Sequence, residues 1–239
     1  MDGHLSWALR KTAFAVSAGA LIFAALFFIA DWAGQRRAES VPAGQAGAST
    51  AAPVSALADQ NASFSPTDPV CHEFFSPLGD PDRRNFANLR QRVSGLYGEY
   101  RKSYMAGHLH AGIDINGPFK GQVQAVGKGR VYLVFRQFPH LSVAVEHILP
   151  DGSVLYSMYV HVMDVKVAVG DEVDETTVLA RLFDAEELAK ADFGTANHLH
   201  FEMRSSLDDG GWASASSMTL EALSRYCRDP LSFFKRHLR

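Results

Sequence analysis

The sequence has little cysteine and no excess of either charge. Its 239 residues include two cysteines and no Cys-x-x-Cys pair, which excludes a zinc site built from cysteines. A net charge of −3 gives no basic surface of the kind that nucleic-acid-binding proteins use, so no nucleic acid is expected as a partner. The sequence also lacks a His-Glu-x-x-His motif, which excludes a catalytic glutamate of that class of metalloprotease.

One long hydrophobic run is present near the N-terminus. Residues 12–30 carry no charge, and a helix of this length rises about 28 Å, close to the thickness of a bilayer's hydrocarbon core. The sequence therefore predicts a cytoplasmic tail over residues 1–11 and a single transmembrane anchor over residues 12–31, with Trp32 at the interface. A cleavable signal peptide is the alternative, although its hydrophobic region is usually only about 7–15 residues long.

A change of composition separates this run from the rest of the chain. Residues 32–70 are rich in Ala, Gly, Ser and Pro, so they cannot bury enough apolar surface to offset the entropy of ordering, and we expect a flexible linker. The folded domain is expected over residues 71–239, bracketed by Cys71 and Cys227. A disulfide between them is expected, with two buried free thiols as the alternative. Because disulfides persist outside the cytosol, this pairing would place the domain in the periplasm or cell envelope, anchored to the inner membrane.

The pattern of the folded domain is mainly that of β-structure. Short strands separated by Gly, Pro and the turn Asp151-Gly152 predict an antiparallel sheet or sandwich with peripheral and C-terminal helices. Strict alternation in the expected strand 154–162 would put Tyr159 and His161 on one face. The other expected strands are 122–125, 129–135, 141–147, 178–182 and 199–203, and the expected helices are 184–190, 220–227 and 231–238, broken at Pro230.

Two histidine-containing stretches carry the candidate chemistry: Gly107-His-Leu-His-Ala-Gly-Ile-Asp-Ile115 and Asn197-His-Leu-His-Phe-Glu202. A straight strand would hold His110 and Asp114 roughly 13 Å apart, too far for one ion, so a bend is expected at Gly112. His198 and His200 would share one face of a strand. One of these two histidines with His110 and Asp114 would supply three ligands and leave a position open for water, as in catalytic zinc sites.

These stretches resemble the motifs of the lysostaphin-type, or LytM-domain, zinc endopeptidases, which cut peptidoglycan cross-bridges. The resemblance covers about residues 75–203 and rests on three motifs in order: His110-Ala-Gly-Ile-Asp114, Tyr159-Val-His161 and His198-Leu-His200-Phe-Glu202. The segment before the last motif, Phe193-Gly-Thr-Ala-Asn197, departs from the Gly-rich pattern of the family. That loop borders the site, so the resemblance does not extend to substrate preference.

The resemblance implies a duplicated hybrid motif fold and one zinc ion. The ligands would be His110, Asp114 and His200, while His161 and His198 would take acid–base and transition-state roles. Tyr159 is assigned as a donor to the developing oxyanion. The implied function is a membrane-anchored zinc metalloendopeptidase that hydrolyses peptide cross-links of peptidoglycan, with peptidoglycan and the membrane as its partners.

Alternatives to this interpretation remain open. A non-catalytic module that binds the wall or activates a hydrolase would share the family motifs. A carrier domain is a third hypothesis, because the turn Val169-Gly-Asp-Glu-Val173 resembles that of biotinyl and lipoyl carriers, although no Met-Lys-Met is present. Within the site, His108 is the alternative to His110 as a ligand. A structural role is expected for His147, and a structural or supporting role for Glu202.

Overall fold

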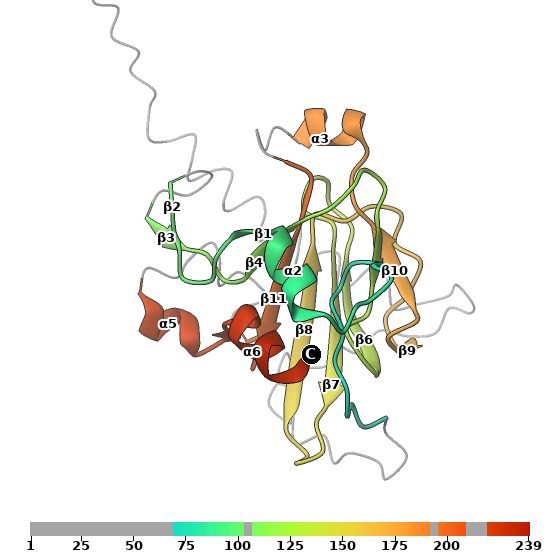
Figure 1. Ribbon diagram of the computed structural model, residues 1–239, viewed down its shortest axis with the longest axis vertical. Helices are drawn as coiled ribbons and strands as arrows, with labels where there is room; N and C mark the ends of the chain where they lie inside the picture. The colour runs from blue at the N-terminus through green and yellow to red at the C-terminus, as the bar shows by residue number, and fades with distance from the viewer. Residues whose placement is uncertain (1–68, 103–106, 192–195, 209–218) are drawn as a thin grey trace, which may run out of the picture. The chain divides into compact units, whose positions relative to one another are not determined.

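The computed structural model describes residues 69–102, 107–191, 196–208 and 219–239 (Figure 1). All of them belong to the unit Ser63–Arg239. The predicted tail, the anchor and nearly all of the linker lie outside the described residues, so these assignments stay predictions. In the part of the chain that the structure describes, no helix is long and apolar enough to cross a bilayer.

An eight-stranded antiparallel sheet forms the centre of the fold. Its order is β1 (Val93–Gly95), β4 (Ile113–Asn116), β11 (His198–Arg204), β8 (Val154–Val160), β7 (Ser142–Ile148), β6 (Gly129–Phe135) and β9 (Glu172–Val173), and β12 (Cys227–Arg228) pairs with β11. Two smaller pairs join β5 (Gln122–Gln124) to β10 (Val178–Arg181) and β2 (Tyr100–Arg101) to β3 (His108–Leu109). The predicted antiparallel β fold is confirmed, as one large sheet with two small ones among the described residues.

Alternation along β11 separates a hydrophobic face from a polar one. Leu199, Phe201 and Met203 are fully buried in the main core, where the Phe201 ring lies 5.3 Å from that of Tyr159. The other side of β11 carries the polar residues of the strand: His198, His200, Glu202 and Arg204. Burial of the apolar residues therefore fixes the strand so that this polar row faces away from the main core.

Short helices with defined N-caps cover part of the sheet. Helix α2 (Phe86–Arg92) begins after Asn85, and α6 (Pro230–His237) begins after Asp229; each cap side chain accepts a hydrogen bond from a backbone N–H of its first turn. Figure 1 shows both helices beside this part of the sheet. Helix α2 contacts β4, and helix α6 contacts β11. Helix α3 (Ala185–Ala191) confirms the helix expected at 184–190. Helix α5 (Leu220–Ser224) is shorter than expected, because residues 225–226 form a turn that leads into β12.

The predicted disulfide is wrong, because Cys71 and Cys227 are both buried thiols that no disulfide joins. Cys71 bonds through its backbone N–H to the carbonyl of Ile148 at the end of β7, and burial raises the pKa of its thiol to about 11. Cys227 pairs instead with Arg204 of β11 and belongs to a separate apolar cluster. The two ends of the domain thus join different strands, with β8 between them, and a disulfide gives no support for export.

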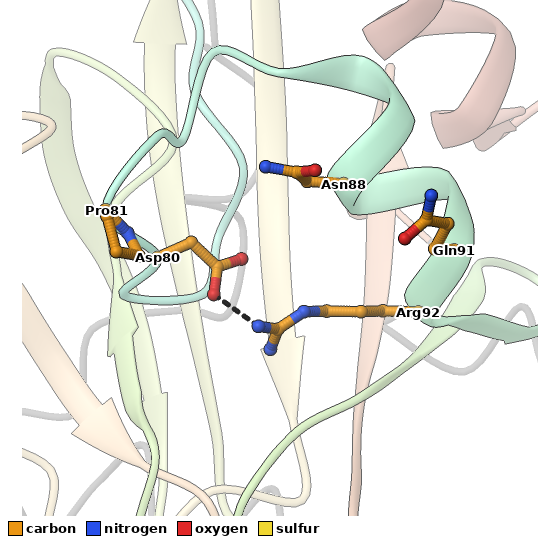
Figure 2. Close-up of a pocket in the computed structure, with 5 residues that line it drawn as sticks. All are labelled: Asp80, Pro81, Asn88, Gln91 and Arg92. Carbon is orange, nitrogen blue, oxygen red and sulfur yellow. Dashed lines mark ion pairs between the residues drawn. The ribbon is translucent and has the colours of Figure 1, made fainter.

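A cavity of about 190 Å³ lies between the Asp80–Pro81 turn and α2 (Figure 2). Asn88, Gln91 and Arg92 line it from the helix, and Arg92 forms an ion pair of 2.6 Å with Asp80 across it. None of the site residues predicted from the sequence lines this cavity. The candidate chemistry therefore lies elsewhere, on the polar face of β11.

Candidate metal centre

Three side chains meet where β4 and β11 pair. His200 of β11 is the register partner of Asp114 in β4, and His110 precedes β4 in the chain. His110 Nε2 lies 2.9 Å from His200 Nδ1 and 3.1 Å from Asp114 Oδ1, and the last two atoms are 3.2 Å apart. The structure therefore brings together all three ligands expected from the sequence, with His110 rather than His108 in the group.

The spacing of these atoms fits a single metal ion. A tetrahedral ion that binds its ligands at about 2.0–2.1 Å keeps them roughly 3.3 Å apart, close to the three separations here. Two imidazole nitrogens and one carboxylate oxygen form a donor set typical of zinc. With three protein ligands, such a site keeps one position for water or substrate, which is the arrangement of catalytic rather than structural zinc.

Gly112 allows His110 to reach the other two ligands. The chain bends at Gly112, between β3 and β4, and a Cβ atom there would overlap the carbonyl oxygen of Phe201 on β11. The bend expected from the sequence is confirmed. Its structural requirement is the close approach of the two backbones, which only glycine permits.

Hydrogen bonds on the outer side of each imidazole select the nitrogen that faces the common point. His110 Nδ1 lies 2.9 Å from the carbonyl of Leu96, and His200 Nε2 lies 2.8 Å from Glu202 Oε1. His110 Nδ1 also lies 2.9 Å from Arg101 Nη2, which can only donate a hydrogen bond. In the tautomer in which His110 Nδ1 donates to Leu96 and His200 Nε2 donates to Glu202, the lone pairs of His110 Nε2 and His200 Nδ1 point toward each other and toward Asp114. Both histidines are thus oriented to bind a cation.

The carboxylate of Glu202 is itself held by Arg204. Arg204 Nη1 donates to Glu202 Oε2 at 2.7 Å, and both side chains are almost fully buried. Burial would raise the pKa of Glu202, but the charges of Arg204 and His200 outweigh it and hold that pKa at about 2. Glu202 therefore remains ionised, and its role as a supporting carboxylate agrees with the expectation from the sequence.

The charges within the triad reinforce one another. Burial would raise the pKa of Asp114, but its hydrogen bonds with His110 and His200 outweigh burial and hold the pKa far below its usual range. Burial would likewise lower the pKa of His200, but its hydrogen bonds with Asp114 and Glu202 raise it to about 9. A metal ion and a proton therefore compete for His200 Nδ1, and binding of the ion releases the proton.

Two further histidines stand next to the triad. His198 Nε2 lies 3.9 Å from Asp114 Oδ1, and the ring of His161 lies 5.4 Å from that of His198 and 6.1 Å from that of His200. His161 Nδ1 is 3.2 Å from the carbonyl of Pro139, which leaves the lone pair on Nε2. Burial, aided by the neighbouring histidines, lowers the pKa of His161, so that its ring is neutral.

Tyr159 does not line this site, so its predicted oxyanion role is wrong. Its side chain is fully buried, and its hydroxyl accepts a hydrogen bond of 2.8 Å from the N–H of Val126. The alternation that placed Tyr159 and His161 on one face ends with β8 at Val160. His161 then adopts a left-handed φ of 64°, which turns its ring toward His200 instead.

Other neighbours of the site could not be identified from the sequence. Arg101 donates to Asp114 Oδ2 at 2.7 Å, and the ring of His140 lies 5.6 Å from that of His161. Neither residue belongs to a motif that signals a site. In the atypical segment before the last motif, residues 192–195 lie outside the described ranges. Asn197, immediately before β11, is anchored by a hydrogen bond that its side chain donates to the carbonyl of Phe183 at 3.0 Å.

Comparison with known proteins gives a family for this segment. Residues 108–212 match peptidase family M23. A search of curated proteins found no match. Among solved structures, the catalytic domain of the antimicrobial peptidase lysostaphin from Staphylococcus simulans is 21% identical, with a TM-score of 0.44, over 64% of this chain and 98% of that chain. LytU is 22% identical, with a TM-score of 0.43, over 62% of this chain and 90% of that chain.

A zinc-containing peptidase from Vibrio cholerae is 25% identical, with a TM-score of 0.40, over 55% of this chain and 36% of that chain. The segment that matches the family contains His110, Asp114 and His200 as well as His161 and His198. The match to peptidase family M23 therefore spans the whole candidate metal centre.

Proposed function

We propose that this protein is a zinc metalloendopeptidase that hydrolyses peptide cross-links of cell-wall peptidoglycan. The convergence of His110, Asp114 and His200 within the M23 match is the observation that supports this most strongly. When bound there, zinc supplies a Lewis acid for the peptide carbonyl and activates water for attack.

The five polar residues of the site divide into two groups. His110, Asp114 and His200 would hold the ion, because each offers a ligand atom to the same point. His161 and His198 lie beside it, and their imidazoles accept a proton from the attacking water and donate one to the leaving amine. His161 is neutral in its buried surroundings, so the lone pair of its Nε2 is available to take up a proton.

We also propose that the domain is tethered to the inner membrane and faces the periplasm or cell envelope. The uncharged run at residues 12–30 and the following linker support this arrangement. As a flexible chain, residues 32–70 would span on the order of 35 Å, which lets the domain reach the wall from the membrane. A reporter fused after Arg239 should be active only outside the cytosol; a cytosolic signal would contradict the tether.

Digestion of purified peptidoglycan tests the proposed activity. The full chain, purified in detergent, should release new peptide amino termini that mass spectrometry can assign to one cross-link. A chelator should abolish release, added zinc should restore it, and Asp114→Ala should be inactive. Release that survives both chelation and Asp114→Ala would contradict the proposal, and binding without cleavage would favour a non-catalytic wall-binding module.

A further inference from the structure

Arg101 contacts Oδ2 of Asp114, whereas the two histidine ligands contact Oδ1. Its Nη2 donates to Asp114 Oδ2 at 2.7 Å, whereas Oδ1 is the atom 3.1 Å from His110 Nε2 and 3.2 Å from His200 Nδ1. The guanidinium also lies 3.8 Å from Glu99. The same Arg101 Nη2 also lies 2.9 Å from His110 Nδ1, on the ring edge away from Asp114 Oδ1. The two oxygens of the buried Asp114 carboxylate therefore have different partners.

The first strand of the sheet supplies the space for this ion pair. Gly95 of β1 is the register partner of Asp114, and a Cβ at residue 95 would overlap both Arg101 Nη2 and Asp114 Oδ2. The guanidinium can reach the carboxylate only because the backbone at residue 95 is bare. Gly95 and Arg101 thus form one structural unit around the outer oxygen of Asp114.

We propose that Arg101 is a positioning residue that keeps Asp114 a one-oxygen ligand of the zinc ion; this inference rests on the proposed function. Carboxylates bind metals through one oxygen or through two. If Asp114 turned both oxygens inward, the second oxygen would fill the position that a catalytic site keeps for water or substrate. A charge-assisted hydrogen bond to Oδ2 opposes that rotation.

Metal affinity alone does not distinguish this role from others. Removing Arg101 deletes a positive charge near a cation, which strengthens binding, and also releases a ligand, which weakens or alters binding. These effects oppose each other in the dissociation constant. The number of atoms bound to the metal changes in one direction only, so it is the decisive quantity.

The test is X-ray absorption on the zinc-loaded full chain, together with the visible spectrum of the cobalt-substituted protein. Wild type should show about four ligands, and Arg101→Gln about five, with weaker cobalt absorption, because Asp114 binds through both oxygens. Gly95→Ala should shift both measurements in the same direction, since its Cβ displaces Arg101. Arg101→Lys should restore part of the wild-type signal, and Arg90→Gln, at an exposed arginine of α2, should leave it unchanged.

The outcomes separate this inference from the proposed function. If wild type binds zinc and the Arg101→Gln and Gly95→Ala proteins show the wild-type coordination number, the positioning role is overturned while the proposed function stands. If wild type binds no zinc, both fail together. Circular dichroism shows which variants are folded, and Arg101→Lys provides a conservative variant if Arg101→Gln unfolds.

Discussion

His198 and His200 lie two residues apart on the same face of β11 but have different surroundings. His200 Nδ1 is within 3.2 Å of both other members of the triad, whereas His198 Nε2 stands 3.9 Å from Asp114 Oδ1. We therefore predict that His198→Ala keeps its zinc and loses about 10²–10⁴ in kcat, the usual contribution of a general acid or base. Metal analysis and turnover on the same sample measure this. Zinc lost together with activity would instead make His198 a ligand.

Replacing Glu202 tests whether its hydrogen bond with His200 orients that ligand. Glu202→Gln should weaken zinc binding about 10–100-fold, because His200 loses the carboxylate that orients its ring. It should also lower the free energy of unfolding by about 1.5–3 kcal/mol, because buried Arg204 loses its charge-assisted hydrogen bond to the carboxylate. Urea unfolding and chelator competition measure the two effects.

Glu221 provides a matched control for this change. It pairs with Arg225 at 3.6 Å, and both side chains are largely exposed, so Glu221→Gln should leave stability and zinc affinity as in wild type. Equal effects of the two substitutions would mean that the Glu202–Arg204 pair has no special role.

His147 predicts a pH dependence of stability. It is fully buried, with Nδ1 2.8 Å from the carbonyl of Lys128, and burial lowers its pKa to about 4. The unfolded chain binds the proton first, at a pKa of about 6.5. The contribution of His147 to the free energy of unfolding should therefore be fully present above pH 6.5 and fall by about 3 kcal/mol as the pH drops to 4.

Urea unfolding across this pH range measures the effect. His147→Gln should flatten the slope by about one proton, and His72→Gln, at an exposed histidine, should keep it. A slope that is the same in wild type and His147→Gln would show that His147 does not bind a proton over this range.

At the scale of elements, strands β4 and β11 must approach closely for the site to form. Gly112→Ala places a Cβ against the carbonyl of Phe201, so it should push the strands apart, reduce the free energy of unfolding by about 2–4 kcal/mol and abolish zinc binding. Thermal unfolding with and without zinc measures both. Gly152→Ala, at a turn residue with a φ of 80°, should cost stability through backbone strain yet keep full zinc binding, because its added Cβ meets no neighbour. A folded Gly112→Ala protein with wild-type zinc affinity would contradict this account.

The sequence predicted where strands occur better than where they end. Strand β6 matches its expected range of 129–135, because β-branched and aromatic residues lie between clear turn signals. Strand β8 stops two residues early, because a left-handed φ at His161 leaves no mark in the pattern of hydrophobic residues. Because of that single dihedral, His161 faces the candidate metal centre while Tyr159 faces the hydrophobic core.

The candidate site was predictable to the extent that it lies in local motifs. His110, Asp114 and one histidine of the pair His198 and His200 could be named because two short stretches carry them, and the family resemblance selected His200. Sheet pairing then brings these stretches together. Arg101 and His140 come from segments without such a motif, and only the folded chain places them beside the ligands. The disulfide predicted between Cys71 and Cys227 was wrong for the same reason: the positions of two cysteines in the sequence do not determine the distance between them in the fold.

For the whole molecule, the state of the two cysteines distinguishes the structure, in which no disulfide joins them, from the disulfide predicted from the sequence. Alkylation of the full chain under denaturing, non-reducing conditions should label both Cys71 and Cys227, because neither is bonded. Without denaturant both should be protected, since both are buried and burial raises the pKa of Cys71 to about 11. Mass spectrometry reads the result. If neither cysteine is labelled after denaturation, the result would support the disulfide predicted from the sequence and contradict the structure.

The proposed function requires that one zinc ion binds where β4 and β11 pair in the central sheet. Equilibrium dialysis of the full chain against zinc, followed by metal analysis, tests this most directly. We predict about one zinc per chain in wild type and a loss of at least about 100-fold in affinity in His110→Ala, Asp114→Ala and His200→Ala. A wild-type chain without zinc, or three variants that bind zinc as wild type does, would contradict the account.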